Sequence, residues 1–263
     1  MRIDLSSHQM KTLPIVDVVV HHEGLKSFLF EQTFEVEPGQ FVMVWIPGLD
    51  EKPFSVSDVR EGMIEITVKA YGPFSLAMME CRVGEAIGVR GPFGRGFRPR
   101  GKGLVVGGGI GIAPLRYLAH RFDRDGVEFK TVLGGRTANE LIFADDFARM
   151  GAQFATDDGS FGEKGLTLPM VEKLCEEESF DVIYGCGPEP MLVALKQLAE
   201  KAGCDCQLSL ERHMKCGIGI CGSCCVDGSG ICICREGPVL DRAELNRVAD
   251  FGMPHRDATG ARK

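Results

Sequence analysis

The pattern of apolar residues changes once along this chain, near residue 101, and that change limits the folds it can adopt. Before this point, short apolar or alternating runs such as QFVMVWIP and MIEITVKAY are separated by turn sequences such as EPG and REG. Several short strands at this spacing predict an antiparallel barrel or sandwich. After it, apolar strands alternate with helix-like segments, as in KGLVVGGG followed by APLRYLAHRFDRDG. This alternation predicts a doubly wound parallel sheet, so we expect a β unit followed by an α/β unit.

A third zone begins near residue 204, where cysteine and glycine replace core-forming residues. Residues 211–238 hold six of the eleven cysteines of the chain, in the run ERHMKCGIGICGSCCVDGSGICICREGP. We therefore expect three units: a barrel over residues 11–100, an α/β domain over 101–203, and a cysteine segment with a tail over 204–263.

Charge and hydropathy exclude several classes of protein. A net charge of −7 argues against binding to nucleic acid, whose affinity comes largely from Lys and Arg. No apolar run reaches the roughly 18–20 residues that cross a bilayer, and the N-terminal sequence MRIDLSSHQMK lacks the apolar core of a signal peptide. We expect a cytoplasmic protein that binds neither membranes nor nucleic acid. In a reducing compartment, clustered thiols are more often metal ligands than disulfides.

The spacing of the clustered cysteines indicates which metal group they bind. Cys216, Cys221 and Cys224 are separated by four and then two residues. This is the spacing of plant-type [2Fe–2S] ligands, whose fourth cysteine lies further along the chain. Zinc sites usually pair CxxC with a second CxxC or with histidines, which fits poorly. We expect an iron–sulfur cluster, with a zinc site and a disulfide arrangement as the alternatives.

Two glycine-rich strand ends predict a nucleotide site in the α/β unit. The stretches LVVGGGIGIAPL and VIYGCGPEPML each run from an apolar strand into a helix, although neither has the GxGxxG spacing. Glycines let the backbone approach a pyrophosphate, and both strand ends face one crevice in a doubly wound sheet. A tight turn without a ligand is the alternative for each stretch. The candidate residues are Gly107, Gly108, Gly109, Gly111, Cys186, Gly187 and Pro188.

Charged residues after two further strands bear on the choice of nucleotide. Arg136 follows a Gly-Gly pair near the expected adenosine ribose, whereas Asp157 and Asp158 follow the next strand. Basic residues there favour NADP and acidic residues favour NAD, so the residues alone leave this choice open.

Two stretches of the barrel unit are weaker candidates for binding a phosphate and a planar ring. In EKPFSVSD, a cation, a proline and two hydroxyls occur at strand spacing, and TVKAYGPFS adds a strand and a glycine turn. For the first, a Lys-Pro turn that enters a strand is the simpler interpretation.

The order of these pieces resembles the ferredoxin-NADP reductase superfamily, in which a barrel with an R-P-x-S strand precedes GGGIGIAP-like and CGP motifs. The resemblance implies that the barrel binds FAD and that the α/β domain binds the nicotinamide nucleotide. Lys52 replaces the usual arginine and lacks its bidentate fork, and Phe74-Ser75 replaces a usual Gly-Thr. The residues implied to bind FAD are Lys52, Pro53, Phe54, Ser55, Thr67, Val68, Lys69, Phe74 and Ser75.

The cysteine segment narrows this resemblance to the electron-transfer subunits of dihydroorotate dehydrogenase B. Their motif M-x-C-G-x-G-x-C-x-x-C…V-C-x-D-G-P-V is matched from Met214 to Val239, with Glu236 in place of the usual Asp and a short loop of nine residues before the last cysteine. The match implies the ligand set Cys216, Cys221, Cys224 and Cys234. It leaves Cys225 and Cys232 as spares, with Cys232 the rival for the fourth position.

The resemblance also implies a function in pyrimidine (UMP) biosynthesis. A catalytic, FMN-containing dihydroorotate dehydrogenase subunit, in a heterotetramer with two of each chain, would pass electrons through [2Fe–2S] and FAD to NAD⁺. One alternative is the small subunit of an NADH-dependent ferredoxin:NADP oxidoreductase or of a hydrogenase-type diaphorase. The non-redox alternative is a zinc-binding adaptor.

Overall fold

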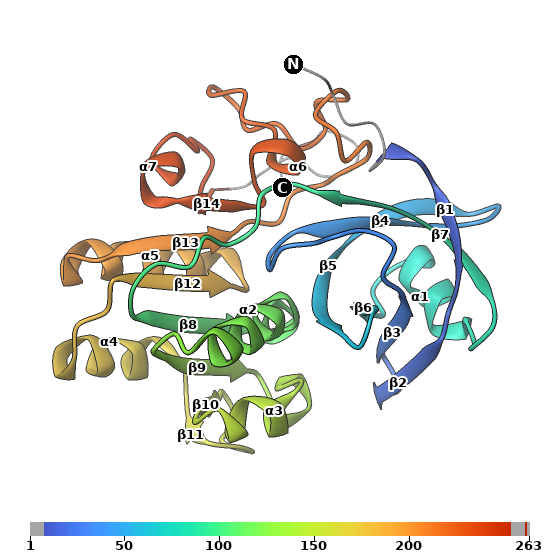
Figure 1. The fold of residues 1–263 in the computed structure, drawn as a ribbon. Coiled ribbons are helices and arrows are strands. Elements are labelled where there is room, and N and C mark those ends of the chain that lie inside the picture. The colour runs from blue at the N-terminus through green and yellow to red at the C-terminus, as the bar shows by residue number, and fades with distance from the viewer. Residues whose placement is uncertain (1–7, 254–260, 262–263) are drawn as a thin grey trace.

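The computed structural model describes residues 8–253 and 261. Two seven-stranded sheets lie side by side, and the C-terminal segment packs across one end of both (Figure 1). The predicted combination of an antiparallel β unit and a parallel α/β unit is confirmed.

The first sheet is antiparallel and curves into a half-barrel with strand order β1-β7-β4-β5-β6-β3-β2. Alternating side chains of its central strands, among them Val42, Val44, Val56 and Ile66, fill the concave core. The strands are β1 (Lys11–Pro14), β2 (Asp17–His22), β3 (Leu25–Glu31), β4 (Phe41–Ile46), β5 (Asp50–Arg60), β6 (Met63–Lys69) and β7 (Ala86–Phe93).

A short helix, α1 (Pro73–Glu80), follows β6 where the sequence predicts only a strand and a turn. Its first turn begins with Pro73, which has no N–H to leave unpaired. The Ser75 hydroxyl accepts hydrogen bonds from the N–H groups of Tyr71 (2.8 Å) and Gly72 (3.0 Å). Ser75 therefore caps this helix, and Phe74 is buried beneath it.

The second sheet has strand order β11-β10-β9-β8-β12-β13-β14 and is parallel except for its last pair. Its first strand, β8, lies at the centre, and the order reverses between β8 and β12. This is the switch point at which doubly wound sheets bind ligands. The strands are β8 (Gly103–Gly108), β9 (Phe129–Gly135), β10 (Gln153–Thr156), β11 (Glu163–Lys164), β12 (Val182–Cys186), β13 (Asp205–Ser209) and β14 (Val239–Asp241). The helices are α2 (Ile112–Asp125), α3 (Ala144–Arg149), α4 (Leu168–Glu177) and α5 (Glu189–Ala202), with 3-10 turns η2 (Gly109–Gly111) and η3 (Ala138–Glu140).

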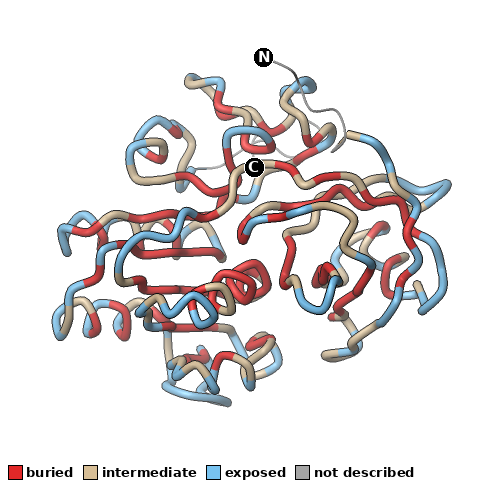
Figure 2. Tube along the Cα trace, in the orientation of Figure 1, coloured by how far each residue is buried: buried red, intermediate tan, exposed pale blue. Residues whose placement is uncertain are grey.

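The boundary expected at residue 203 falls inside this sheet. Strand β13 pairs with β12, and β14 returns from the cysteine segment to pair with β13. Cys206 and Leu208 are buried in the sheet, so one cysteine that opens the third zone belongs to the α/β core. Two short helices, α6 (Ile233–Glu236) and α7 (Arg242–Leu245), complete the segment, and Figure 2 shows that burial extends into α6 and β14. The end of the expected tail, residues 254–260 and 262–263, lies outside the described residues.

Helix α2 joins the two sheets, because it contacts β5 of the half-barrel as well as β8 and β12. Its Arg116, which is 4% exposed, donates hydrogen bonds to both carboxylate oxygens of Glu65 on β6, at 3.0 and 3.1 Å. The same guanidinium also pairs with Asp146 on α3 at 2.5 Å, and disrupting a buried ion-pair network of this kind is strongly destabilising. The two units are therefore held in a defined orientation. Across the described part of the chain, none of the helices combines the length and the apolar character that spanning a membrane requires.

Candidate functional site

The cysteine loop follows β13 and precedes α6 in the sequence, and it lies above β4 and β7 of the half-barrel (Figure 1). Met43 and Phe93 of these strands share a hydrophobic cluster with Cys224 and Cys234. Cys224 and Cys234 are buried, Cys216 is half-buried and Cys221 is exposed, and all four have free thiols. Backbone N–H groups point at three of the sulfurs: Ile218 to Cys216 (3.4 Å), Gly219 to Cys234 (3.1 Å) and Cys234 to Cys224 (3.3 Å). The loop thus directs backbone donors toward sulfur.

These hydrogen bonds change the acidity of the thiols. Burial raises the pKa of Cys216, but hydrogen bonds from the backbone of Ile218, Cys221 and Ile220 outweigh it and bring the value to about 7. A hydrogen bond from the Cys234 thiol lowers the pKa of Cys224 to about 7, and Cys234, which keeps that proton, has a raised pKa. The loop therefore stabilises thiolates, the form that binds metals.

The four thiols form two pairs, Cys216 with Cys221 and Cys224 with Cys234. In residues 8–253 and 261, no three His, Cys, Asp or Glu side chains are grouped as ligands of a single metal ion. Four cysteines, three of them with backbone donors directed at their sulfurs, are the donor set of a [2Fe–2S] cluster, so the residues present fit that group.

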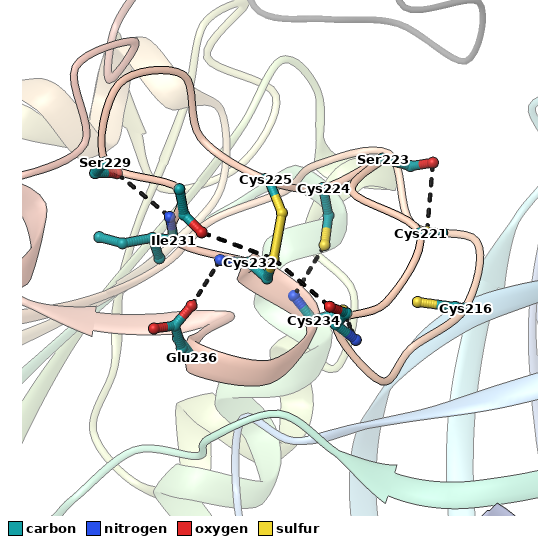
Figure 3. The surroundings of a disulfide bond; sticks show 12 residues. Cys216, Cys221, Ser223, Cys224, Cys225, Ser229, Ile231, Cys232, Cys234 and Glu236 are labelled. Atoms are coloured by element: carbon teal, nitrogen blue, oxygen red, sulfur yellow. Dashed lines mark hydrogen bonds between the residues drawn. A yellow bond between two sulfur atoms is a disulfide. The ribbon is translucent and has the colours of Figure 1, made fainter.

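The two spare cysteines are joined in a disulfide, a pairing that was not predicted from the sequence (Figure 3). Cys225 and Cys232 face each other at the base of a hairpin, in which Val226 N–H bonds the Ile231 carbonyl at 2.8 Å. The Asp-Gly pair at residues 227–228 is a hairpin signal between two cysteines, and it could have indicated this pairing. Because the Cys232 sulfur is bonded to Cys225, it is not available as a metal ligand. The Cys234 sulfur is free and lies beside that of Cys224, another predicted ligand.

Glu236, which replaces the usual Asp of the motif, has a structural role. Its carboxylate accepts a hydrogen bond from the Cys232 N–H at 2.7 Å, at the start of α6. This contact stabilises the single helical turn that carries Cys234.

An ion pair that the sequence did not predict attaches the cysteine loop to the half-barrel. The Arg90 guanidinium on β7 donates to both oxygens of Glu51 on β5, at 2.5 and 2.8 Å. It also donates to the Cys216 carbonyl at 2.9 Å. Glu51 and Arg90 are 39 residues apart, so no local motif marks them. One side chain thus connects a predicted cluster ligand to the strand that carries Lys52.

The residues implied to bind FAD lie on β5, β6 and α1, but their side chains differ in accessibility. The Phe54 and Phe74 rings are 5.9 Å apart, and Lys52 forms an ion pair with Asp50 at 2.5 Å. Pro53 and Ser55 lie on the same strand and are half-buried. Val68 instead packs in the barrel core, and Thr67, which points to the opposite side of β6, is also buried. The Thr67 hydroxyl is engaged by Ser27 (2.9 Å) and Ser57 (2.7 Å).

The glycine-rich strand ends meet at a cavity of about 680 Å³ at the switch point of the α/β sheet. Gly108, Gly109, Gly111, Gly187 and Pro188 line it. A Cβ atom at Gly111 would lie 2.5 Å from the Cys186 carbonyl oxygen, so only glycine allows the start of α2 to approach β12 this closely.

Two members of the predicted nucleotide-binding set, Gly107 and Cys186, lie behind the cavity wall. A Cβ at Gly107 would meet the Leu133 side chain at 2.8 Å. Burial raises the pKa of the Cys186 thiol to about 12, so it is neutral at physiological pH.

The cavity is also lined by residues from outside the glycine motifs. Arg136 and Asp157, considered above for the ribose, are joined by Glu140, Glu211 and Lys69. Lys69, which the resemblance implies for FAD, forms an ion pair with Glu140 at 3.2 Å across the two units. No sequence motif marks Glu140, which ends the short 3-10 turn η3.

Comparison with known proteins adds a family assignment to this geometry. Residues 211–246 match the family described as the iron-sulfur cluster binding domain of dihydroorotate dehydrogenase B. A relative from Methanocaldococcus jannaschii, described as a probable dihydroorotate dehydrogenase B (NAD(+)), electron transfer subunit, is 43% identical over 248 residues, which cover 94% of this chain and 95% of the relative. A relative of the same description from Methanothermobacter thermautotrophicus is 43% identical and covers 96% of each chain.

Solved structures share the fold. The structure of an NADH-dependent reduced ferredoxin-NADP oxidoreductase superposes with a TM-score of 0.80 and 31% identity, covering 91% of this chain and 93% of that one. A ferredoxin NADP+ reductase from Neisseria gonorrhoeae with bound FAD and NADP matches with a TM-score of 0.62 and 18% identity, over 74% of this chain and 92% of that one. The second likeness concerns the fold alone.

Proposed function

Because the chain belongs to the family of dihydroorotate dehydrogenase B electron-transfer subunits, we propose that it carries electrons from a catalytic dihydroorotate dehydrogenase subunit to NAD⁺. The observation that carries this proposal is the Glu51–Arg90–Cys216 contact. It holds the predicted cluster loop against the predicted flavin strand, and electron transfer requires such proximity.

The cysteine loop is proposed to hold the cluster through Cys216, Cys221, Cys224 and Cys234. Backbone donors stabilise charge on the sulfurs, which is one of the means by which proteins set the potential of a cluster. When bound, the cluster supplies single-electron transfer, FAD exchanges one or two electrons, and NAD⁺ accepts a hydride.

The half-barrel of residues 11–100 is proposed to hold FAD. Lys52 and the backbone N–H groups that begin α1 supply positive charge for the pyrophosphate. Phe54 provides an apolar surface on β5, and the buried Phe74 ring packs 5.9 Å from it. Pro53, Ser55 and Lys69 complete the side-chain set, whereas Thr67 and Val68, whose side chains are buried, contribute backbone groups.

The α/β unit is proposed to hold NAD⁺ in the cavity at the switch point. Gly108, Gly109, Gly111 and Gly187 leave space for the pyrophosphate at the start of α2. Hydride transfer requires no acid–base residue of the chain. Its residues bind and orient the nucleotide.

The partner is proposed to be an FMN-containing catalytic subunit that docks over the tip of the cysteine loop. Ile220 is 78% exposed there, next to the exposed Cys221. An apolar side chain beside a cluster ligand suits a protein interface. We propose a heterotetramer with two copies of each chain.

A second function, the small subunit of an NADH-dependent ferredoxin:NADP oxidoreductase, is favoured by one observation. A structure of that enzyme is 31% identical to this chain over 91% of its length. Relatives with 43% identity favour the first function.

The test is dihydroorotate-dependent reduction of NAD⁺ by the chain purified with its catalytic subunit. We expect activity in the wild type and in Cys232→Ser, and loss of the [2Fe–2S] absorbance and of the activity in Cys234→Ser. Retained FAD and iron without dihydroorotate-dependent activity would contradict the first function and favour the second. An intact cluster in Cys234→Ser would overturn the ligand assignment.

A further inference from the structure

Glu140 closes one side of the nucleotide cavity and holds the two basic side chains that face it. Its carboxylate accepts hydrogen bonds from Arg136 Nε (3.1 Å), Arg136 Nη2 (2.6 Å) and the Arg136 N–H (3.0 Å). Lys69 Nζ, from the half-barrel, lies 3.2 Å from the same carboxylate. All three residues line the cavity.

The backbone around this ion-pair cluster is fixed by the neighbouring loop. Asp157 N–H bonds the Gly135 carbonyl (3.1 Å), and Asp158 N–H bonds the Arg136 carbonyl (3.2 Å). A Cβ atom at Gly135 would lie 2.9 Å from the Glu140 Cβ, so glycine allows Glu140 to fold back over the strand end. The position of Glu140 is thus set by the fold and not by the pair alone.

Glu140 is the most buried member of this ion-pair cluster, and it carries a permanent negative charge. Its side chain is only 17% exposed, whereas that of Arg136 is 76% exposed at the cavity rim. The hydrogen bonds from Arg136, reinforced by Lys69, lower the pKa of Glu140 to about 2, so it is ionised at any physiological pH. Asp157 adds a second carboxylate near Arg136.

These contacts have opposite consequences for the two nicotinamide nucleotides. The 2′-hydroxyl of an NAD ribose is neutral and is well matched by a carboxylate, which accepts its hydrogen bond. The 2′-phosphate of NADP is anionic and requires a free arginine or lysine. Here the fork of Arg136 is already filled, and an incoming phosphate would lie beside Glu140.

We propose that Glu140 is the specificity-determining residue that makes this cavity select NAD over NADP, by occupying Arg136 and Lys69. The inference rests on the proposed placement of NAD in the cavity. It predicts that the cavity contains a latent phosphate site, and that removing the charge of Glu140 exposes it.

The experiment measures calorimetric binding of two probes that differ only in the 2′-phosphate, adenosine 5′-monophosphate and adenosine 2′,5′-bisphosphate. Neither probe requires a redox readout. In Glu140→Gln we expect the affinity ratio to shift toward the bisphosphate by roughly tenfold or more, the effect of one hydrogen bond to a charged group. In Glu140→Gln/Arg136→Ala the shift should largely disappear. Glu177→Gln, which removes one exposed carboxylate from the far end of α4, should leave the ratio unchanged.

Arg136→Ala alone tests the same idea without altering Glu140. Because the guanidinium is already occupied, this variant should change the ratio by less than about twofold. An unchanged ratio in Glu140→Gln, or a shift that persists in Glu140→Gln after both Arg136 and Lys69 are replaced by Ala, would overturn the inference. If the wild type binds no monophosphate, the proposed NAD placement fails as well. Monophosphate binding with an unchanged ratio in Glu140→Gln refutes the specificity role alone.

Discussion

Replacing Arg90 by glutamine should weaken the attachment of the cysteine loop to the half-barrel. The side chains of Arg90 and Glu51 are 13% and 21% exposed, so water compensates only in part for a lost partner. The substitution removes two hydrogen bonds to a carboxylate and one to the Cys216 carbonyl. Hydrogen bonds to charged groups contribute about 1.5–3 kcal/mol each before such compensation. We expect a loss of about 2 kcal/mol in the free energy of unfolding.

The assay is urea unfolding followed by circular dichroism, with a double-mutant cycle that adds Glu51→Gln. If the two side chains act as a pair, the cycle should give a coupling energy of about 1 kcal/mol or more. Arg90→Lys should lie between wild type and Arg90→Gln, because it keeps the charge but loses the fork. The control is Lys173→Gln, which breaks an exposed pair on α4 and should cost less than about 0.5 kcal/mol.

In the reconstituted protein, Arg90→Gln should also alter the electron paramagnetic resonance spectrum of the cluster, because the backbone of Cys216 loses its anchor. Additive free energies in the cycle, together with a spectrum identical to wild type, would refute a connecting role for Arg90. A spectral change in Lys173→Gln would show that the effect is not local.

Three further predictions concern single residues. The pKa of Glu140 is lowered to about 2 from an ordinary 4.5, so its contribution to stability is complete above about pH 4.5 and is lost as the pH falls toward 2. The unfolding free energies of wild type and Glu140→Gln should therefore converge over that pH range. A constant difference between them would contradict this prediction. Burial raises the pKa of the Cys186 thiol to about 12, so iodoacetamide at pH 8 should label this cysteine only after the protein is unfolded. Mass spectrometry of the peptide that contains Cys186 measures the labelling. Rapid labelling in the folded protein would disprove the prediction. Reduction of the Cys225–Cys232 disulfide should lower the free energy of unfolding by about 2 kcal/mol, the loop-entropy value for a short ring. Reductant should not change the urea unfolding of Cys225→Ser, because this variant cannot form the disulfide. An equal destabilisation of Cys225→Ser by reductant would contradict the prediction.

The sequence predicts the two sheets because their strands carry the signal of burial locally. Strands β8 and β12 are apolar throughout and are buried on both faces, whereas in β5 apolar and polar residue types alternate over residues 54–57. Helix α1 was missed because its eight residues are nearly all apolar and Leu76 is 56% exposed, which leaves no clear helical period. The Pro73 and Ser75 caps were the remaining signal.

Long-range pairing explains the other omissions. Strand β14 has only three residues, and it is defined by its pairing with β13 across the whole cysteine loop. The side chains of Glu140 and Lys69 meet across 71 residues. No pattern within a window of the sequence contains either contact, so both require the folded chain.

The choice between Cys232 and Cys234 shows where spacing stops being informative. The first three cysteines lie in one tight loop, so their separations alone restrict the ligand geometry. The last two are only two residues apart, and their orientation depends on what each segment packs against. Cys232 immediately precedes α6, lies opposite Cys225 and pairs with it, whereas the turn of α6 directs Cys234 toward the Gly219 N–H and Cys224. The hairpin and the helix turn therefore act together: the first occupies the rival thiol, and the second presents its neighbour to the loop.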